Sequence, residues 1–199
     1  MKKTVYFGLV LSICLLATGC AAEKAEPSTK PLETVEPSPS PSAEPTPEPS
    51  PSVPPRDLIF DANGEPILGE YGLANGMAAV DNIDIFTTEE IMIIARYSDG
   101  ALATAVDGTL SDRLLADFDN TIAIIAAADP TAFNGGPEQF GYTCLGIGFE
   151  MWYDLDGGII SEDDCAVIFA EHDLTEAEQA VLDKVIEGFI QAKSEHEDS

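Results

Sequence analysis

The sequence predicts an α+β fold for residues 57–199, an antiparallel sheet covered by a C-terminal helix and preceded by a disordered, proline-rich linker. Large apolar side chains occupy the odd positions of residues 142–153, which is the period of a strand with one buried face. Apolar residues within 181–190 recur at helical spacing and indicate an amphipathic helix. The dipeptide Asn63-Gly64 separates two apolar runs, a pattern typical of a β-hairpin.

The first twenty residues have the organisation of a secretory signal. Two lysines precede an apolar run, residues 5–17, which is too short to span a bilayer. The following stretch, Leu15-Leu16-Ala17-Thr18-Gly19-Cys20, resembles the lipobox of bacterial lipoproteins. This resemblance implies that residues 1–19 are a removed signal peptide and that Cys20 carries acyl chains. Two or more acyl chains on one cysteine hold a protein stably in a membrane, whereas a single acyl chain binds only marginally. The resemblance therefore implies lipid anchoring in the cell membrane on its extracytoplasmic face, and the alternative is an ordinary secreted protein.

Residues 20–56 are expected to be a lipid-bearing cysteine followed by a disordered linker. Eleven of the fourteen prolines lie between residues 21 and 56, interspersed with Ser, Thr and Glu. Such a composition buries too little apolar surface to fold, and proline keeps it extended. At about 3.1 Å per residue the segment reaches on the order of 110 Å. A passive stalk is favoured over a docking site for partners that recognise proline motifs.

The predicted domain is strongly acidic. Residues 57–199 contain thirty acidic side chains and four basic ones, Arg96, Arg113, Lys184 and Lys193, so that the formal net charge is −26. Nucleic acid binding requires a basic surface, which this composition excludes. Contact with the membrane is therefore expected only through the lipid anchor. The candidate binding partners are therefore an envelope protein or a small ligand. The sequence leaves the oligomeric state open.

The first half of the domain is predicted to contain mainly strands. Residues 58–60 and 66–68 flank the Asn63-Gly64 turn, and 101–106 is expected to be the second arm of another hairpin. The β-branched run 91–97 favours a strand, although Thr87 to Glu90 has the pattern of a helix capping box. Residues 111–118 are predicted to be a short helix capped by Ser111, and 121–128 a central strand, with a helix as the alternative.

The second half is predicted to be a loop (131–141), the strand 142–153, a turn and a returning strand (165–170). Gly146 and Gly148 leave one face of strand 142–153 shallow, so either a helix or a ligand is expected to pack closely against it. The last helix begins at a capping box, Thr175-Glu176-Ala177-Glu178, and should cover the sheet.

Two cysteines remain in the predicted domain, Cys144 and Cys165. A disulfide between them is plausible outside the cytosol and would stabilise the fold by roughly 3 kcal/mol. The alternative is a pair of buried thiols.

An acidic stretch near residue 160 is the candidate metal site. Residues 154–164 resemble a calcium loop of the EF-hand or dockerin kind with one position deleted, and the resemblance implies Asp154, Asp156 and Asp164 as ligands. The alternative is an Asp-Gly hairpin turn with solvated acids. No other cofactor is expected.

Catalytic motifs are scarce. The trio Glu171-His172-Asp173 is interpreted as a surface histidine between two acids, because no nucleophile is evident near it. Trp152 and Tyr142 are candidates for lining a small apolar or sugar site. The sequence therefore favours a non-enzymatic binding or interaction module. A calcium-binding module is the first alternative, and a wall-active hydrolase that uses paired carboxylates is the second.

Overall fold

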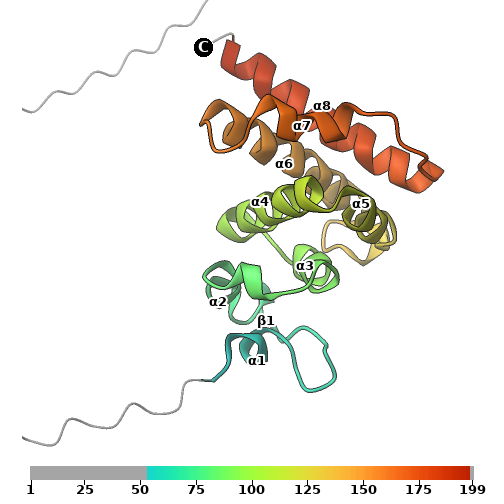
Figure 1. The fold of residues 1–199 in the computed structure, drawn as a ribbon. Coiled ribbons are helices and arrows are strands. Elements are labelled where there is room, and N and C mark those ends of the chain that lie inside the picture. Colours follow the sequence, from blue (N-terminus) through green and yellow to red (C-terminus); the bar gives the residue numbers. More distant parts are fainter. Residues whose placement is uncertain (1–52, 198–199) are drawn as a thin grey trace, which may run out of the picture. The chain divides into compact units, whose positions relative to one another are not determined.

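The computed structural model describes residues 53–197, and this part of the chain is mostly helical (Figure 1). The elements in chain order are α1 (Pro55–Ile59), β1 (Leu68–Gly69), β2 (Gly72–Leu73), α2 (Gly76–Val80), η1 (Ile83–Ile85), α3 (Thr88–Ala95), α4 (Gly100–Ala116), α5 (Phe118–Ala126), η2 (Pro130–Ala132), α6 (Gly136–Asp156), α7 (Glu162–Phe169) and α8 (Glu176–Glu197). The predicted signal peptide, Cys20 and most of the linker lie outside the described residues and stay predictions.

The predicted α+β class is wrong. Within residues 53–197 the only sheet is the pair β1–β2, two residues in each strand, and no helix has a sheet to cover. The turn at Asn63-Gly64 is present: Gly64 has a positive φ of 81°, and Phe60 and Pro66 form an isolated antiparallel bridge across it. The run before the turn belongs instead to α1, so the local turn signal was correct although the strands were not.

The predicted strand 91–97 is helix α3. Thr87 Oγ1 accepts a hydrogen bond from the Glu90 amide, and the Glu90 carboxylate accepts one from the Thr87 amide, which completes the capping box. Ile91 and Ile94 are fully buried on the inner side of this helix. Helix propensities of ordinary residues differ by only about 0.7 kcal/mol, so burial outweighs the β-branched character of the run.

The predicted strands 101–106 and 121–128 are also helical. The first lies in α4, which continues through the predicted helix 111–118 as far as Ala116, so Ser111 is an interior residue and not a cap. The second lies in α5, whose inner face buries Ile122 and Ile125. An apolar run without clear alternation fits a buried helix as well as a central strand, and here tertiary packing selects the helix.

The predicted strand 142–153 is the middle of α6. Its buried residues recur every three to four positions, as on one side of a helix: Thr143 and Cys144, then Ile147 and Gly148, then Met151. The loop predicted at 131–141 ends early, because α6 begins at Gly136. The period-two pattern was misleading because large apolar residues lie on more than one face of this helix, which packs against both α4 and α8.

Close approach at the α6 glycines is confirmed, and the packing partners are helices. A methyl group at Gly148 would lie 2.6 Å from the Phe189 backbone nitrogen of α8 and still closer to the Val185 carbonyl oxygen. Gly188 of α8 lies in the same way against the Leu145 backbone of α6. Gly146 is covered by the carboxyl group of Asp107 from α4. The two longest helices therefore cross almost backbone to backbone.

The last two helices differ in how well they were predicted. The predicted strand 165–170 is α7, which starts at a capping box between Ser161 and Asp164. The C-terminal helix is confirmed as α8, and the capping interaction between Thr175 and Glu178 is formed. Val181, Leu182, Val185 and Phe189 are buried along its inner face.

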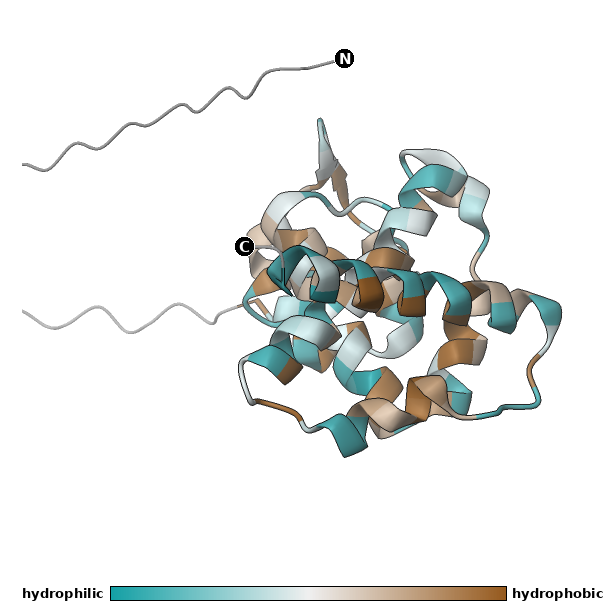
Figure 2. Ribbon diagram, turned by 90° about the horizontal axis from the view of Figure 1, so that it is seen from above, coloured by the Kyte–Doolittle hydropathy of each residue, from teal (hydrophilic) through white to brown (hydrophobic). Residues whose placement is uncertain are grey.

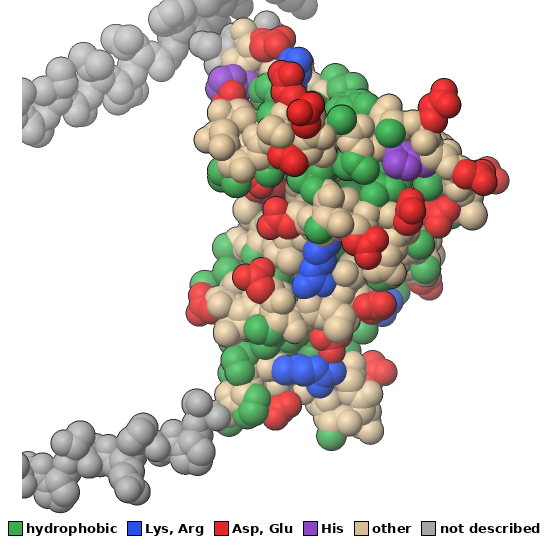
Figure 3. Space-filling model, viewed as in Figure 1, with side chains coloured by type: hydrophobic (Ala, Val, Ile, Leu, Met, Phe, Trp, Pro, Cys, Tyr) green, Lys and Arg blue, Asp and Glu red, His purple; other side chains and the backbone are tan. Residues whose placement is uncertain are grey.

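The described helices share a single hydrophobic core. Figure 2 shows that hydrophobic residues, in brown, alternate with hydrophilic ones along the helices. Acidic side chains are spread over the face shown in Figure 3, with few basic ones between them. In the part of the chain that the structure describes, no helix is both long and apolar enough to cross a membrane.

Candidate functional site

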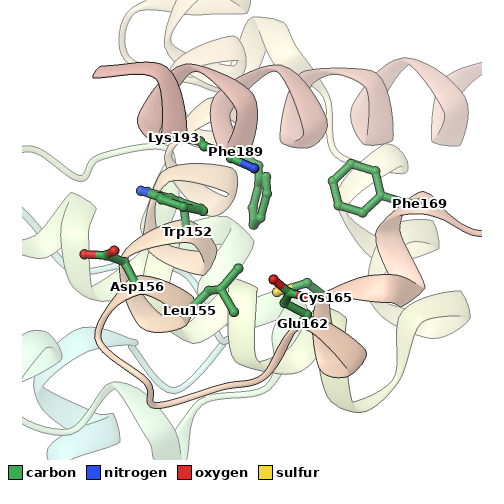
Figure 4. A pocket seen from close by; sticks show the side chains of 8 residues that line it. All are labelled: Trp152, Leu155, Asp156, Glu162, Cys165, Phe169, Phe189 and Lys193. Carbon is green, nitrogen blue, oxygen red and sulfur yellow. The ribbon is translucent and has the colours of Figure 1, made fainter. Parts of the chain in front are cut away.

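A cavity of about 480 Å³ opens between the last turns of α6, the helix α7 and the C-terminal half of α8 (Figure 4). We call it the aromatic pocket. Its lining residues are Trp152, Leu155, Asp156, Glu162, Cys165, Phe169, Phe189 and Lys193. Ligand sites in proteins typically have volumes of 300–1,000 Å³, and this pocket falls within that range. Its lining is mixed, with five apolar and three charged side chains.

A sharp turn after α6 creates the pocket. α6 ends at Asp156, and Gly158 has a φ of 71°, a left-handed conformation that glycine adopts without strain. The Ser161–Asp164 capping box then starts α7. The turn brings α7 into contact with both α6 and α8, so that three helices contribute side chains to one cavity.

Three aromatic rings, one from each helix, form the apolar part of the pocket. The Phe189 ring is the central one, with ring centroids 5.5 Å from Trp152 at an interplanar angle of 87° and 5.5 Å from Phe169 at 76°. Both are edge-to-face arrangements, which aromatic pairs favour. Phe189 is buried, whereas Phe169 is 53% exposed at the mouth. In Figure 4 Leu155 and Cys165 lie on the side of the cavity opposite α8.

Charged groups lie around these rings. The Lys193 ammonium lies 5.8 Å from the Trp152 ring centroid, within the range of a cation–π interaction. Asp156 and Glu162 add two carboxylates, and Asp156 lies 3.5 Å from His196 Nε2. The pocket therefore combines aromatic faces with negative charge, and a side chain of the same protein already places a cation there.

The two thiols are free and buried, so the predicted Cys144–Cys165 disulfide is not present. Cys165 lines the aromatic pocket, and Cys144 lines a second cavity of about 490 Å³ between α5, α6 and α8. A disulfide needs Cα atoms within about 7 Å, whereas these two side chains face different cavities. Burial raises the pKa of Cys165, aided by Asp164 and Glu162, and raises the pKa of Cys144 to about 12. Both groups are thus protonated at neutral pH and are poor nucleophiles.

The residues of the predicted calcium loop are not gathered around one point. Asp154 and Asp156 lie in the last turn of α6, whereas the Asp164 carboxylate accepts hydrogen bonds from the amide and hydroxyl of Ser161 at the start of α7. These hydrogen bonds lower the Asp164 pKa. Among residues 53–197 there is no group of three or more His, Cys, Asp or Glu side chains that could hold a metal ion. Calcium binding stays a prediction that no geometry here supports.

The histidine of the Glu171-His172-Asp173 trio has a structural role. His172 stacks on Phe118 with ring centroids 3.9 Å apart, and its Nε2 donates to the Val167 carbonyl oxygen at 2.7 Å. Because Nε2 is engaged as a donor and the ring is stacked, the histidine holds the segment after α7 against α5.

Two other carboxylates, Asp107 of α4 and Glu150 of α6, are close enough for the charge of Glu150 to act on Asp107. Burial raises the Asp107 pKa to about 8, with the Glu150 charge as the second cause. Burial also raises the pKa of Glu150, followed by the charge of Asp154. Neither Asp107 nor Glu150 lines the aromatic pocket. The carboxylate pair whose pKa values are raised thus lies outside the aromatic pocket, whereas the two carboxylates that line the pocket are Asp156 and Glu162.

Sequence reasoning identified only part of the pocket. Trp152 was a predicted site residue and lines it, whereas Tyr142 is exposed and donates a hydrogen bond to Glu138. Asp156 and Cys165 also line it, although they were predicted as a metal ligand and a disulfide cysteine. Leu155, Phe169 and Phe189 were missed as site residues. Trp152, Leu155 and Asp156 are three and four apart, a helical spacing that would have grouped them once α6 was recognised as a helix.

The chain was also compared with protein family models, with curated proteins and with solved structures, and none of them matches. The inference of function therefore depends on the lipobox-like segment and on the aromatic pocket.

Proposed function

We propose that this chain is a lipid-anchored protein of the extracytoplasmic membrane face and that its helical domain is a non-catalytic binding module. In this proposal Cys20 carries the acyl chains, residues 21–56 are the linker between the membrane and the domain, and the aromatic pocket binds the ligand. Binding is supported chiefly by one observation: three helices place the aromatic side chains Trp152, Phe169 and Phe189 around one open cavity. Absence of an activated nucleophile at Cys165 favours binding over covalent catalysis at this place.

Anchoring is tested by replacing Cys20. The full chain should incorporate labelled palmitate in a bacterial host and partition with membranes, whereas Cys20→Ala should lose the label and be recovered in soluble fractions, because the sulfur atom is the acylation site. Cys14→Ala is the matched control and should retain both properties, since it removes a thiol from the predicted signal peptide. Unchanged labelling of Cys20→Ala would contradict lipid anchoring at this residue.

Binding in the aromatic pocket is tested with the uncharged fluorescent probe 1-aminoanthracene. We expect saturable fluorescence enhancement with one probe per chain, and Phe169→Ala should weaken the affinity at least about fivefold, since the ring contributes apolar contact at the pocket mouth.

The matched control for this probe is Tyr153→Ala. Tyr153 and Phe169 are both 53% exposed, but Tyr153 does not line the pocket. Equal affinities of the two variants would place the probe elsewhere, for instance in the cavity lined by Cys144, and would contradict the proposed site.

A further inference from the structure

We infer that the ligand of the aromatic pocket is a small organic cation, an ammonium or quaternary ammonium group carried on an aliphatic unit. This inference rests on the proposed function, because it specifies what the pocket binds. The observation behind it is one juxtaposition: three aromatic rings, two carboxylates and a lysine ammonium that lies against one of the rings.

The rings supply the attraction. The faces of aromatic rings carry partial negative charge, and a cation within about 6 Å of a ring centroid is stabilised by it. Lys193 Nζ lies 5.8 Å from the Trp152 centroid, so the pocket already satisfies this condition with a cation of its own chain. Phe189 and Phe169 extend the aromatic wall beyond the lysine, and that part of the cavity is open to a ligand.

The charges around the pocket favour a ligand with positive charge. Asp156 and Glu162 both line it, while Lys193 is its only basic lining residue. The predicted domain as a whole has a formal net charge of −26, which raises the local concentration of cations and repels anions. A neutral apolar ligand would contact the rings but gain nothing from the two carboxylates.

Lys193 acts in this arrangement as an internal competitor. A bound cation has to share the Trp152 face with the lysine ammonium or displace it. Lys193→Met keeps an apolar stem of similar length and removes the charge. The variant should therefore bind an organic cation about two- to fivefold more tightly. Lys184→Met on the same helix is the matched control, because Lys184 lines the other cavity and pairs with Glu187.

The test compares choline with 3,3-dimethylbutan-1-ol, which has the same shape but no charge. Trp152 is the only tryptophan of the chain, so the tryptophan emission of the purified full chain, excited at a wavelength where its five tyrosines do not absorb, reports on this pocket. Choline should change the emission saturably at a concentration at least tenfold lower than the alcohol. Glu162→Gln should weaken choline binding about two- to fivefold, whereas Asp163→Asn, a neighbouring acid that does not line the pocket, should leave it within twofold.

The outcomes separate the inference from the proposed function. Equal binding of choline and the alcohol, or no choline response in a chain that binds 1-aminoanthracene in a Phe169-dependent manner, would overturn the cation inference and leave the pocket as a binding site. Failure of all three probes would overturn both. Glycerophosphocholine, which adds a phosphate, should bind more weakly than choline; tighter binding would show that a lipid headgroup is the ligand and would overturn the assignment to a free cation.

Discussion

Replacing Gly148 or Gly188 by alanine should destabilise the domain by about 3 kcal/mol or more, the largest effect expected of any single methyl group in the α6–α8 contact. At both positions the new methyl group would enter the backbone of the opposite helix: Val185 and Phe189 for Gly148, and Leu145 for Gly188. Backbone atoms in a packed helix cannot rotate away as a side chain can, so the helices must separate. Small domains are stable by only 5–15 kcal/mol, so either variant removes a large part of the total.

Urea denaturation of the full chain, followed by circular dichroism at the helical minimum, measures this effect. Gly141→Ala and Gly108→Ala are matched controls, because both positions lie inside helices and have no neighbouring atom where the methyl group would be placed. Each should be neutral or gain up to about 1 kcal/mol, since alanine is the better helix former. Stability of Gly148→Ala within 1 kcal/mol of the wild type would mean that α6 and α8 do not cross at the glycines.

Asp107→Asn should make the domain more stable at pH 7 by about 2–3 kcal/mol. The Asp107 carboxyl lies against Gly146 near Glu150, and burial raises its pKa to about 8, well above the ordinary value of 3.8. One pKa unit corresponds to about 1.4 kcal/mol, which gives about 4 kcal/mol between pH 3.8 and 7 for a fully enclosed group. The residue is only half-buried, so solvent screening reduces the expected gain to the lower figure. Asparagine has nearly the same shape and carries no charge to bury.

The same shift sets the pH dependence of the wild type. Because the folded-state pKa is raised, the stability that protonated Asp107 contributes is fully present below about pH 4, declines as the pH rises and is lost above about pH 8. The raised pKa values of Glu150 and Asp112 act in the same direction. Hydrogen bonds lower the pKa values of Asp61 and Glu178, whose contribution is present above the ordinary pKa and lost as the pH falls through the lowered one.

Thermal melts between pH 4.5 and 8.5 test this dependence. The wild-type melting temperature should fall as the pH rises, and Asp107→Asn should flatten the profile. Asp163→Asn, an exposed acid on α7, is the control for the loss of one charge. A lower melting temperature of Asp107→Asn at pH 7 would show that the carboxylate is ionised and makes a favourable interaction in the folded protein.

The helix start at Thr175 is the part of the fold that local sequence signals predicted well, whereas the capping pattern at Thr87 was noted but a strand was favoured after it, and the predicted cap at Ser111 was wrong. The capping boxes at Thr87 and Thr175 are both formed, because a cap depends on hydrogen bonds within a few residues of the chain. The apolar runs between them were misassigned. Residues 91–97 and 121–128 are rich in isoleucine, which suits a buried strand, and the choice of helix depends on neighbours that lie far away in the chain.

The glycines in 142–153 show where a wrong secondary structure still led to a correct packing prediction. Because glycine has no side chain, Gly146 and Gly148 allow a neighbouring element to approach the backbone closely, whether they lie in a strand or in a helix. Here α4 approaches at Gly146 and α8 at Gly148. The site was less predictable. Trp152 was recognised as a candidate, but Phe169 and Phe189 read as ordinary apolar residues of two other segments.

By itself the sequence determined the acidic character of the domain, the capped helix start at Thr175 and the tight turn at Gly64, because each of these depends on composition or on residues close together in the chain. Only the tertiary structure decided that 142–153 is a helix, that Cys144 and Cys165 face different cavities, and that Trp152, Phe169 and Phe189 meet around one pocket. The physical reason is that these features depend on how the chain turns after α6 and on how closely α6 and α8 cross, and both involve contacts between residues distant in sequence.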